Sequence, residues 1–299
     1  MSGYAAPRFW PVWLSLALLW LAAHLPWRWQ MALGDGVGRL AWHLVPRRRR
    51  ITQTNLAHCF PELSEAEHDA LARHHFRHNG RALFEGALAF FAPVHRLQAL
   101  ITRIDGLEQI EQARTAGKGV VLLGGHFTSM ILCGRLLALH LPLQIVYKEA
   151  SNPLSERMAR HYRAQHYEGL IENTDFRSLV RRLKENRVVW YAPDQDFGRH
   201  HGVFAPFFGV ATITLTHTAR LARLTGAAVV PISYGLDAAG GGYRLTLHPP
   251  LDDFPSGDEV ADATRYNRLL EAFVRERPAE YLWVHRRFKT RPPGEPPFY

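Results

Sequence analysis

Short apolar runs alternate with longer segments of helical periodicity through most of this 299-residue sequence. Runs that are rich in Val, Ile, Leu and aromatic residues are typical of buried strands. The expected strands are residues 120–123, 143–147, 188–192, 228–234 and 243–247, and the expected helices are residues 130–139, 153–166, 175–186, 213–225 and 258–276. Because strands that alternate with helices form one sheet covered by those helices, the sequence predicts an α/β fold with a mixed, largely parallel sheet.

A further helix is expected before the first of these strands. Ser64 and Glu67 have the spacing of a capping box, in which each side chain bonds the backbone amide of the other residue at the start of a helix. Apolar residues then recur at steps of three or four. Pro93 stops this pattern, so the sequence predicts a long helix that begins after Ser64 and ends before Pro93.

The N-terminal region is apolar and rich in tryptophan. Residues 11–25 contain no Asp, Glu, Lys or Arg, and Trp10, Trp27 and Trp29 flank them. Aromatic residues at both ends of an apolar run are typical of segments that meet the membrane interface. Fifteen residues fall short of the roughly 20 that a spanning helix needs, although residues 9–29 reach that length. We therefore expect an N-terminal membrane anchor helix that is shallow or tilted.

A cleaved signal peptide is a less favoured interpretation of the same region. Only one basic residue, Arg8, precedes the apolar run, and tryptophans follow it where a cleavage site would have small residues. The four arginines at residues 47–50 favour the cytoplasmic, anionic face of a membrane. These arginines form either a solvated loop or a patch that binds phosphates and lipid head groups. Residues 1–50 are thus expected to be an anchor with a basic juxtamembrane segment, and residues 51–299 a separate domain.

The charge of the chain predicts acidic partners. Its formal net charge is +9, from 36 Lys and Arg against 27 Asp and Glu. Phosphates, an anionic membrane, an acidic carrier protein or nucleic acid would all fit that charge. No nucleic-acid-binding motif accompanies it, so we exclude nucleic acid as a partner. The two cysteines, Cys59 and Cys133, are too few for a disulfide framework or a metal quartet and fit a reducing compartment.

The tripeptide Gly124-Gly125-His126 lies between an expected strand and an expected helix. Glycines allow the backbone to turn sharply and to approach a substrate closely. A histidine at such a turn, at the carboxyl end of a strand, is placed where an α/β enzyme has its site and can act as a general base. We expect the first amides of the following helix to disfavour the imidazolium and to keep the ring of His126 neutral.

Two carboxylates, Asp194 and Asp196, follow another expected strand. If the backbone stays extended there, both side chains face the same side. Turn capping and a role in a binding site are both compatible with this pattern. No third ligand lies nearby in the sequence, so the pattern predicts no metal site.

Five groups of residues, taken together, match a known family. The groups are Asn55-Leu56 with Cys59-Phe60-Pro61; His126-Phe127 with Gly134-Arg135; Trp190-Tyr191-Ala192-Pro193-Asp194 with Asp196 and Gly198; Val203-Phe204 with Pro206-Phe207-Phe208; and Trp283-Val284-His285-Arg286-Arg287-Phe288-Lys289-Thr290-Arg291-Pro292. Through them the chain resembles the late acyltransferases of lipid A biosynthesis, the lauroyl and myristoyl transferases of the Gram-negative inner membrane. These belong to the lysophospholipid acyltransferase superfamily.

The resemblance implies a function, partners and a location. It implies transfer of a fatty acyl chain from acyl carrier protein to a hydroxyl of an acyl chain on the phosphorylated glucosamine disaccharide of a lipid A precursor. Acyl carrier protein would be a substrate, and no cofactor or metal is expected. Residues 51–299 would form the acyltransferase domain on the cytoplasmic face of the inner membrane.

The resemblance also implies roles for single residues. His126 matches the histidine that deprotonates the acceptor hydroxyl. The candidate substrate-binding residues are Gly125, Arg135, Lys148, Asp194 and Asp196. Among them, Lys148 is the looser match to a phosphate-binding residue of the superfamily.

One departure from the family concerns the acid that partners the histidine. The family has an acid where this chain has Ile131, five positions after His126. Losing the carboxylate partner of a catalytic histidine costs on the order of 10⁴ in rate. Either Asp194, Asp196 or Glu149 supplies the carboxylate, or the chain is a weakened or inactive form, natural or engineered. Isoleucine suits a buried helix position, so we expect the fold to survive in every case.

Two alternative functions stay open at this point. The chain could acylate another lipid acceptor, such as a lysophospholipid or an amino-acid lipid. It could also be a non-catalytic lipid-binding relative, which only Ile131 favours.

Overall fold

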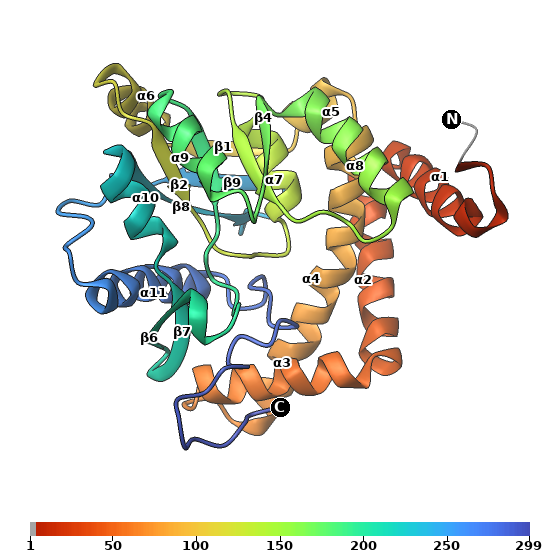
Figure 1. Cartoon of the computed structure of the whole chain (residues 1–299). Helices are drawn as coiled ribbons and strands as arrows, with labels where there is room; N and C mark the ends of the chain where they lie inside the picture. Colours follow the sequence, from red (N-terminus) through yellow and green to blue (C-terminus); the bar gives the residue numbers. More distant parts are fainter. Residues whose placement is uncertain (1–3) are drawn as a thin grey trace.

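A seven-stranded sheet lies at the centre of the structure, a computed structural model that describes residues 4–299 (Figure 1). Its strands follow the order β1-β9-β8-β2-β5-β3-β4, and neighbouring strands are parallel except for the antiparallel pair β8 and β9. The strands are β1 (Ile101–Asp105), β2 (Val120–Leu123), β3 (Gln144–Tyr147), β4 (Gly169–Glu172), β5 (Val188–Tyr191), β8 (Ala228–Leu236) and β9 (Tyr243–Leu247). The expected mixed, largely parallel sheet is therefore confirmed.

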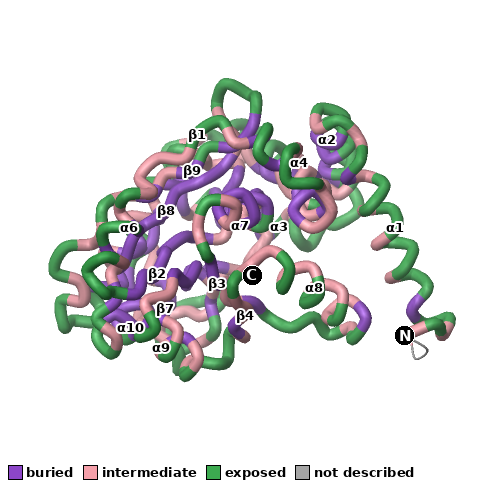
Figure 2. Tube along the Cα trace, turned by 90° about the horizontal axis from the view of Figure 1, so that it is seen from above, coloured by how far each residue is buried: buried purple, intermediate pink, exposed green. Residues whose placement is uncertain are grey.

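Helices cover both faces of this sheet. The α-helices of the described residues are α1 (Trp10–His24), α2 (Trp27–Leu44), α3 (Pro46–Cys59), α4 (Glu65–Phe91), α5 (Val94–Gln98), α6 (Leu107–Thr115), α7 (Met130–Leu137), α8 (Pro153–His166), α9 (Phe176–Lys184), α10 (His217–Thr225) and α11 (Glu259–Glu276). Figure 2 shows α6, α9 and α10 on one side of the sheet and α4 and α7 on the other. All residues of β2 and β5 are buried, as expected for parallel strands covered on both faces.

One predicted helix begins too early. Residues 213–215 belong to strand β7 (Val210–Leu215), which pairs with β6 (Gly202–Phe207) in a separate antiparallel hairpin, and helix α10 begins only at His217. Phe208 and Gly209 both have positive φ, which matches the two-residue turns that suit the twist of a hairpin. The alternation of threonine with apolar residues in β7 favours a strand, and sequence reasoning gave it too little weight.

The N-terminal apolar run forms two helices instead of one. Helix α1 ends at His24, Leu25 has extended backbone, and α2 begins after Pro26. Proline disfavours helical backbone at the residue before it, which explains the break. Within residues 4–299, no helix is both long and apolar enough to cross a membrane. The expected membrane anchor helix is therefore not supported.

The four arginines at residues 47–50 are helical and do not form a loop. They occupy the start of α3, and two of them contact the rest of the fold. Arg48 donates a hydrogen bond to the carbonyl oxygen of Val284 (2.9 Å), and the guanidinium of Arg49 lies 5.3 Å from the ring centroid of Trp42. The interpretation as a solvated loop is wrong, and a role in binding phosphates stays a prediction.

The long predicted helix is confirmed as α4, with both bonds of the capping box between Ser64 and Glu67. Helix α2 lies along α4 at very short range (Figure 1). A Cβ atom placed on Gly80 of α4 would lie 2.0 Å from the carbonyl oxygen of Gly34, and one placed on Gly38 would lie 2.3 Å from that of Phe76. Only glycine allows backbones to approach so closely, so these glycines fix the contact between the two helices.

Substituting Gly80 by alanine should therefore weaken the fold. We expect Gly80→Ala to lower the free energy of unfolding by about 1–3 kcal/mol, the usual cost of overpacking. The matched control is Gly36→Ala in α2, where an added Cβ meets no atom within 4 Å. There the substitution should be neutral or should stabilise by up to about 1 kcal/mol through helix propensity. Denaturant titration of both variants measures the difference, and equal effects would contradict the role of the glycine contact.

Candidate active site

His126 lies at the carboxyl end of the central strand β2, before α7. Two buried tyrosine hydroxyls hold the turn that carries it: Tyr266 donates to the carbonyl oxygen of Gly124 (3.0 Å) and Tyr234 to that of Gly125. A Cβ atom on Gly125 would lie 2.4 Å from Cδ1 of Leu270. A side chain at the second glycine would therefore displace Leu270, and the two tyrosine bonds hold the backbone of the turn.

The carboxylate of Asp194 binds His126 twice. Its Oδ1 lies 2.5 Å from Nδ1 of the ring, and its Oδ2 accepts a hydrogen bond from the backbone amide of His126 (2.9 Å). Asp194 follows β5, which pairs in parallel with β2, so the carboxyl ends of the two strands bring the residues together. The side chain of Asp194 is 1% exposed and that of His126 is 23% exposed. The histidine is therefore partly accessible, while its partner is enclosed.

This contact also sets the charge of both groups. Burial lowers the pKa of His126, but the negative charge of Asp194 and its hydrogen bond raise it, with a net rise above the ordinary value of 6.5. Burial raises the pKa of Asp194, but the charge and hydrogen bonds of His126 outweigh it and hold that pKa well below its ordinary value. The expectation that the imidazolium is disfavoured is wrong, because the buried carboxylate is the stronger influence and raises the pKa of the ring.

The pair has the geometry of a general base and its orienting acid. An ionised carboxylate only accepts hydrogen bonds, so Nδ1 of His126 carries the proton that points at Asp194. In the neutral ring this leaves the lone pair of Nε2 free to take a proton from a substrate hydroxyl.

An apolar pocket with a basic wall opens at His126. It has a volume of about 230 Å³, and we call it the dyad pocket. Its apolar wall includes Met130, Ile131 and Trp190, and its basic wall includes Lys148 and Arg163. The full lining is Ala89, Phe90, His126, Met130, Ile131, Gly134, Ile145, Val146, Tyr147, Lys148, Arg163, His166, Tyr167 and Trp190. Next to the base, the apolar wall suits contact with hydrocarbon and the basic wall suits contact with an anionic group.

Of the residues predicted from the sequence, some line the dyad pocket and others do not. Lys148 lines it and is exposed, as expected for a residue that contacts a ligand. Ile131 also lines it and is 42% exposed, so the expectation of a buried helix position is wrong. The side chain at this position faces the pocket because it lies on the first turn of α7. Arg135 is 6% exposed and lies outside the lining of the pocket.

The two other acids considered as partners of His126 lie elsewhere. Both carboxylate oxygens of Asp196 accept hydrogen bonds from Thr290, at 2.6 Å from the backbone amide and 2.8 Å from the hydroxyl. The carboxylate of Glu149 lies 3.8 Å from the guanidinium of Arg160. Asp194 and Asp196 therefore have different partners, and of the three candidate acids Asp194 is the one that reaches the histidine.

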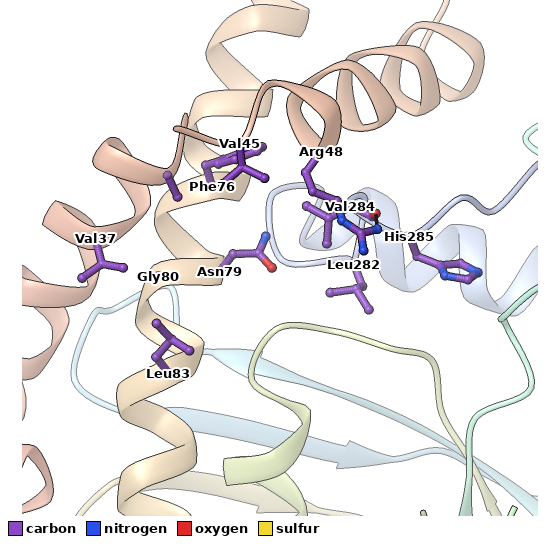
Figure 3. Close-up of a pocket in the computed structure, with 11 residues that line it drawn as sticks. Val37, Val45, Arg48, Phe76, Asn79, Gly80, Leu83, Leu282, Val284 and His285 are labelled. Atoms are coloured by element: carbon purple, nitrogen blue, oxygen red, sulfur yellow. Dashed lines mark hydrogen bonds between the residues drawn. The ribbon is translucent and has the colours of Figure 1, made fainter. Parts of the chain in front are cut away.

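A larger cavity of about 450 Å³ lies between α2, α4 and the segment that follows α11 (Figure 3). We call it the α2 groove. Figure 3 shows Val37 and Leu83 on the two helices and His285 on the C-terminal segment. Neither His126 nor Asp194 lines it. Because acyl transfer needs a base at the reacting hydroxyl, the smaller dyad pocket is the candidate active site.

Sequence reasoning missed several residues of the site. Tyr234 and Tyr266 come from β8 and α11, and Arg163 and His166 come from α8. Parallel strands and their covering helices bring these residues to the carboxyl end of β2. A basic residue on an amphipathic helix usually faces solvent, so no sequence signal distinguished Arg163.

Comparison with known proteins identifies the family. Residues 2–290 match the family described as "Bacterial lipid A biosynthesis acyltransferase". The chain belongs to this family. It is therefore assigned to the acyltransferases, and the resemblance stated from the sequence motifs is confirmed.

Curated relatives support the same assignment over nearly the whole chain. The chain is 37% identical to the lipid A biosynthesis palmitoleoyltransferase of Escherichia coli K12, over 98% of this chain and 95% of that protein. It is 36% identical to the lauroyltransferase of the same strain, over 98% and 96%. Identity to the myristoyltransferase is 31%, over 98% of this chain and 91% of that protein.

The raised pKa of His126 can be measured directly. We expect its imidazole to titrate above pH 6.5 in an NMR titration, and the pKa to fall in Asp194→Asn because the stabilising charge is gone. A group with a raised folded-state pKa stabilises the fold below its unfolded pKa and stops doing so as pH rises through the folded value. Asp194, with a lowered pKa, stabilises above its unfolded value of 3.8.

The loss of stability in Asp194→Asn should thus be largest between pH 3.8 and 6.5 and should shrink at higher pH. A stability difference that does not vary with pH would contradict a charged pair.

Proposed function

We propose that this protein transfers a fatty acyl chain from acyl carrier protein to a hydroxyl of an acyl chain on a lipid A precursor. His126 would act as the general base and Asp194 as the acid that orients it. The observation that carries the proposal is the 2.5 Å contact between Asp194 and His126 at the mouth of an apolar pocket. Family membership supports the reaction class.

In the proposed mechanism, Nε2 of His126 removes the proton of the acceptor hydroxyl as its oxygen attacks the thioester carbonyl. The imidazolium that forms is stabilised by the carboxylate of Asp194, as in the triads of hydrolases. The tetrahedral intermediate then collapses with loss of the thiolate of the carrier, which takes the proton back from His126. An ester is formed and a thioester is broken, so the step balances without a redox partner, metal or cofactor.

Ile131 does not require an inactive protein in this proposal. The family acid would approach the histidine from α7, whereas Asp194 already holds Nδ1 from the neighbouring strand β5. A second hydrogen bond, from the backbone amide of His126 to Asp194, fixes the carboxylate further. We therefore infer that activity survives and that Ile131 serves as part of the apolar wall of the dyad pocket.

We further propose that the protein works at the cytoplasmic face of the inner membrane. The support is an exposed apolar surface on α1 and α2, which includes Leu14, Leu18, Trp29, Leu40 and Leu44. Solvent-exposed apolar patches of this kind mark interaction sites. The adjacent arginines at the start of α3 suit anionic lipid head groups and an acidic carrier protein.

The direct test combines acyl carrier protein with a labelled acyl chain, a tetra-acylated lipid A precursor and mass spectrometry of the product. His126→Ala should abolish transfer, and Asp194→Asn should lower kcat by a factor of about 10³–10⁴. In Asp194→Asn the acid limb of the pH profile should also move to lower pH, because the base has lost the charge that raises its pKa.

Glu149→Gln is the control for these variants. It removes another of the candidate acids, whose side chain is exposed and pairs with Arg160. Activity of this variant should stay within about twofold, since exposed ion pairs contribute little. Equal activity of wild type and Asp194→Asn would overturn the assignment of the orienting acid.

Ile131→Glu tests whether the missing family acid limits the rate. Because Asp194 occupies Nδ1, we expect no gain of orders of magnitude. The new carboxylate would instead put a charge on the apolar wall of the dyad pocket and raise KM for the acyl donor. Ile131→Gln controls for polarity without charge. A large rise in kcat for the glutamate variant alone would mean that Asp194 does not replace the family acid.

A further inference from the structure

A second cavity lies next to the dyad pocket. It has a volume of about 340 Å³, and residues of α1, α4 and α8 surround it. We call it the α1 cavity. Phe90 lines both spaces, and consecutive turns of α8 contribute Met158, Ala159 and Tyr162 to the α1 cavity and Arg163 to the dyad pocket. The two cavities are therefore neighbours along one helix and share a wall.

The α1 cavity is suited to hydrocarbon. None of the described residues that line it carries a charge, and most are apolar: Pro11, Val12, Ser15, Leu16, Leu19, Phe90, Phe91, Ser155, Met158, Ala159 and Tyr162. Helix α1 turns its stripe of Val12, Leu16 and Leu19 toward this space, whereas Leu14 and Leu18 on its other side are exposed. One helix face thus forms a wall of this partly open cavity, and the opposite face is exposed to solvent.

Aromatic rings separate the two cavities. The ring of Tyr162 lies 6.1 Å from that of Phe90 and 4.9 Å from that of Phe91, measured between centroids. These contacts join the end of α4 to α8. Side chains at such a wall change rotamer more easily than the backbone moves, so the wall can open without refolding.

The dyad pocket alone is small for the proposed reaction. Its volume of about 230 Å³ lies below the range of about 300–1,000 Å³ that is usual for small-molecule sites. The α1 cavity more than doubles the available space. A long acyl chain whose carbonyl lies at His126 would then extend past Phe90 toward α1.

We propose that the acyl chain of the donor occupies both cavities, with its thioester end at His126 and its methyl end in the α1 cavity. Helix α1 then forms the far wall of the chain site and limits the length of chain that is transferred. This inference rests on the proposed function. It assigns to the N-terminal helix a part in substrate selection.

The main test fills the α1 cavity from α8. In a competition between donors of different chain length, Ala159→Phe should shift transfer toward shorter chains, by about fourfold in kcat/KM for each methylene that no longer fits. The matched control is Ala41→Phe, the same change on a helix that lines the α2 groove. It should leave the donor profile unchanged.

A second variant changes the wall that α1 contributes to the same cavity. Leu16→Trp should also favour shorter donors, and agreement between the two variants would exclude an effect of α8 alone. An unchanged donor profile in both folded variants, or a shift in the control as well, would overturn the proposal. A change in kcat/KM for different acceptors, with the donor profile unchanged, would also overturn the proposal.

A binding experiment separates this inference from the proposed function, because it needs no turnover. A fatty acid with a diazirine at its methyl end should label α1 or α8 residues of the α1 cavity, such as Leu19 or Met158. The same acid with the diazirine near its carboxyl end should label the dyad pocket. Labelling in the α2 groove, or none above background, would overturn the chain site even if transfer is observed.

Discussion

The bond between Asp194 and His126 is the contact on which the site depends, and it exists only because β2 and β5 are neighbours. Their parallel register pairs Leu123 with Tyr191, so the loops that follow both strands begin at the same edge of the sheet. Further hydrogen bonds fix both residues. Two tyrosine hydroxyls bond the turn that carries His126, and the backbone amide of His126 bonds the carboxylate of Asp194. A buried carboxylate without this cation and amide would be costly, so site and fold stabilise one another.

A strap formed by the C-terminal segment closes the other side of the site. The amide of Leu282 donates to the carbonyl oxygen of His126 (3.0 Å), and Arg287, 1% exposed, donates to the carbonyl oxygen of Ile213 (2.7 Å). Asp196 fastens the end of the strap at Thr290. The motif from residue 283 to residue 292 thus has a structural use, and a substrate contact for Asp196 stays a prediction.

Local sequence patterns predicted the sheet and the position of His126, because strands buried on both faces and glycine turns leave direct signals. They could not choose among Asp194, Asp196 and Glu149, since the choice depends on the order of the strands, and no local pattern encodes that order. For the same reason the roles of Tyr234 and Arg163 became visible only in three dimensions. The prediction of a single N-terminal anchor helix was wrong because it was based on the apolar composition of residues 9–29 and gave too little weight to Pro26, where the helix breaks.

The glycine contact between α2 and α4 has a mechanical consequence. Where Gly34 and Gly38 meet Gly80, backbone touches backbone, and no layer of side chains is left that could slide or yield. Helices α2 and α4 therefore form one rigid unit. Its outer edge carries the exposed apolar residues of α2, and its far end carries Phe90. If the exposed edge of α2 meets a lipid surface, as proposed above, the same rigid pair of helices joins that surface to the wall between the two cavities.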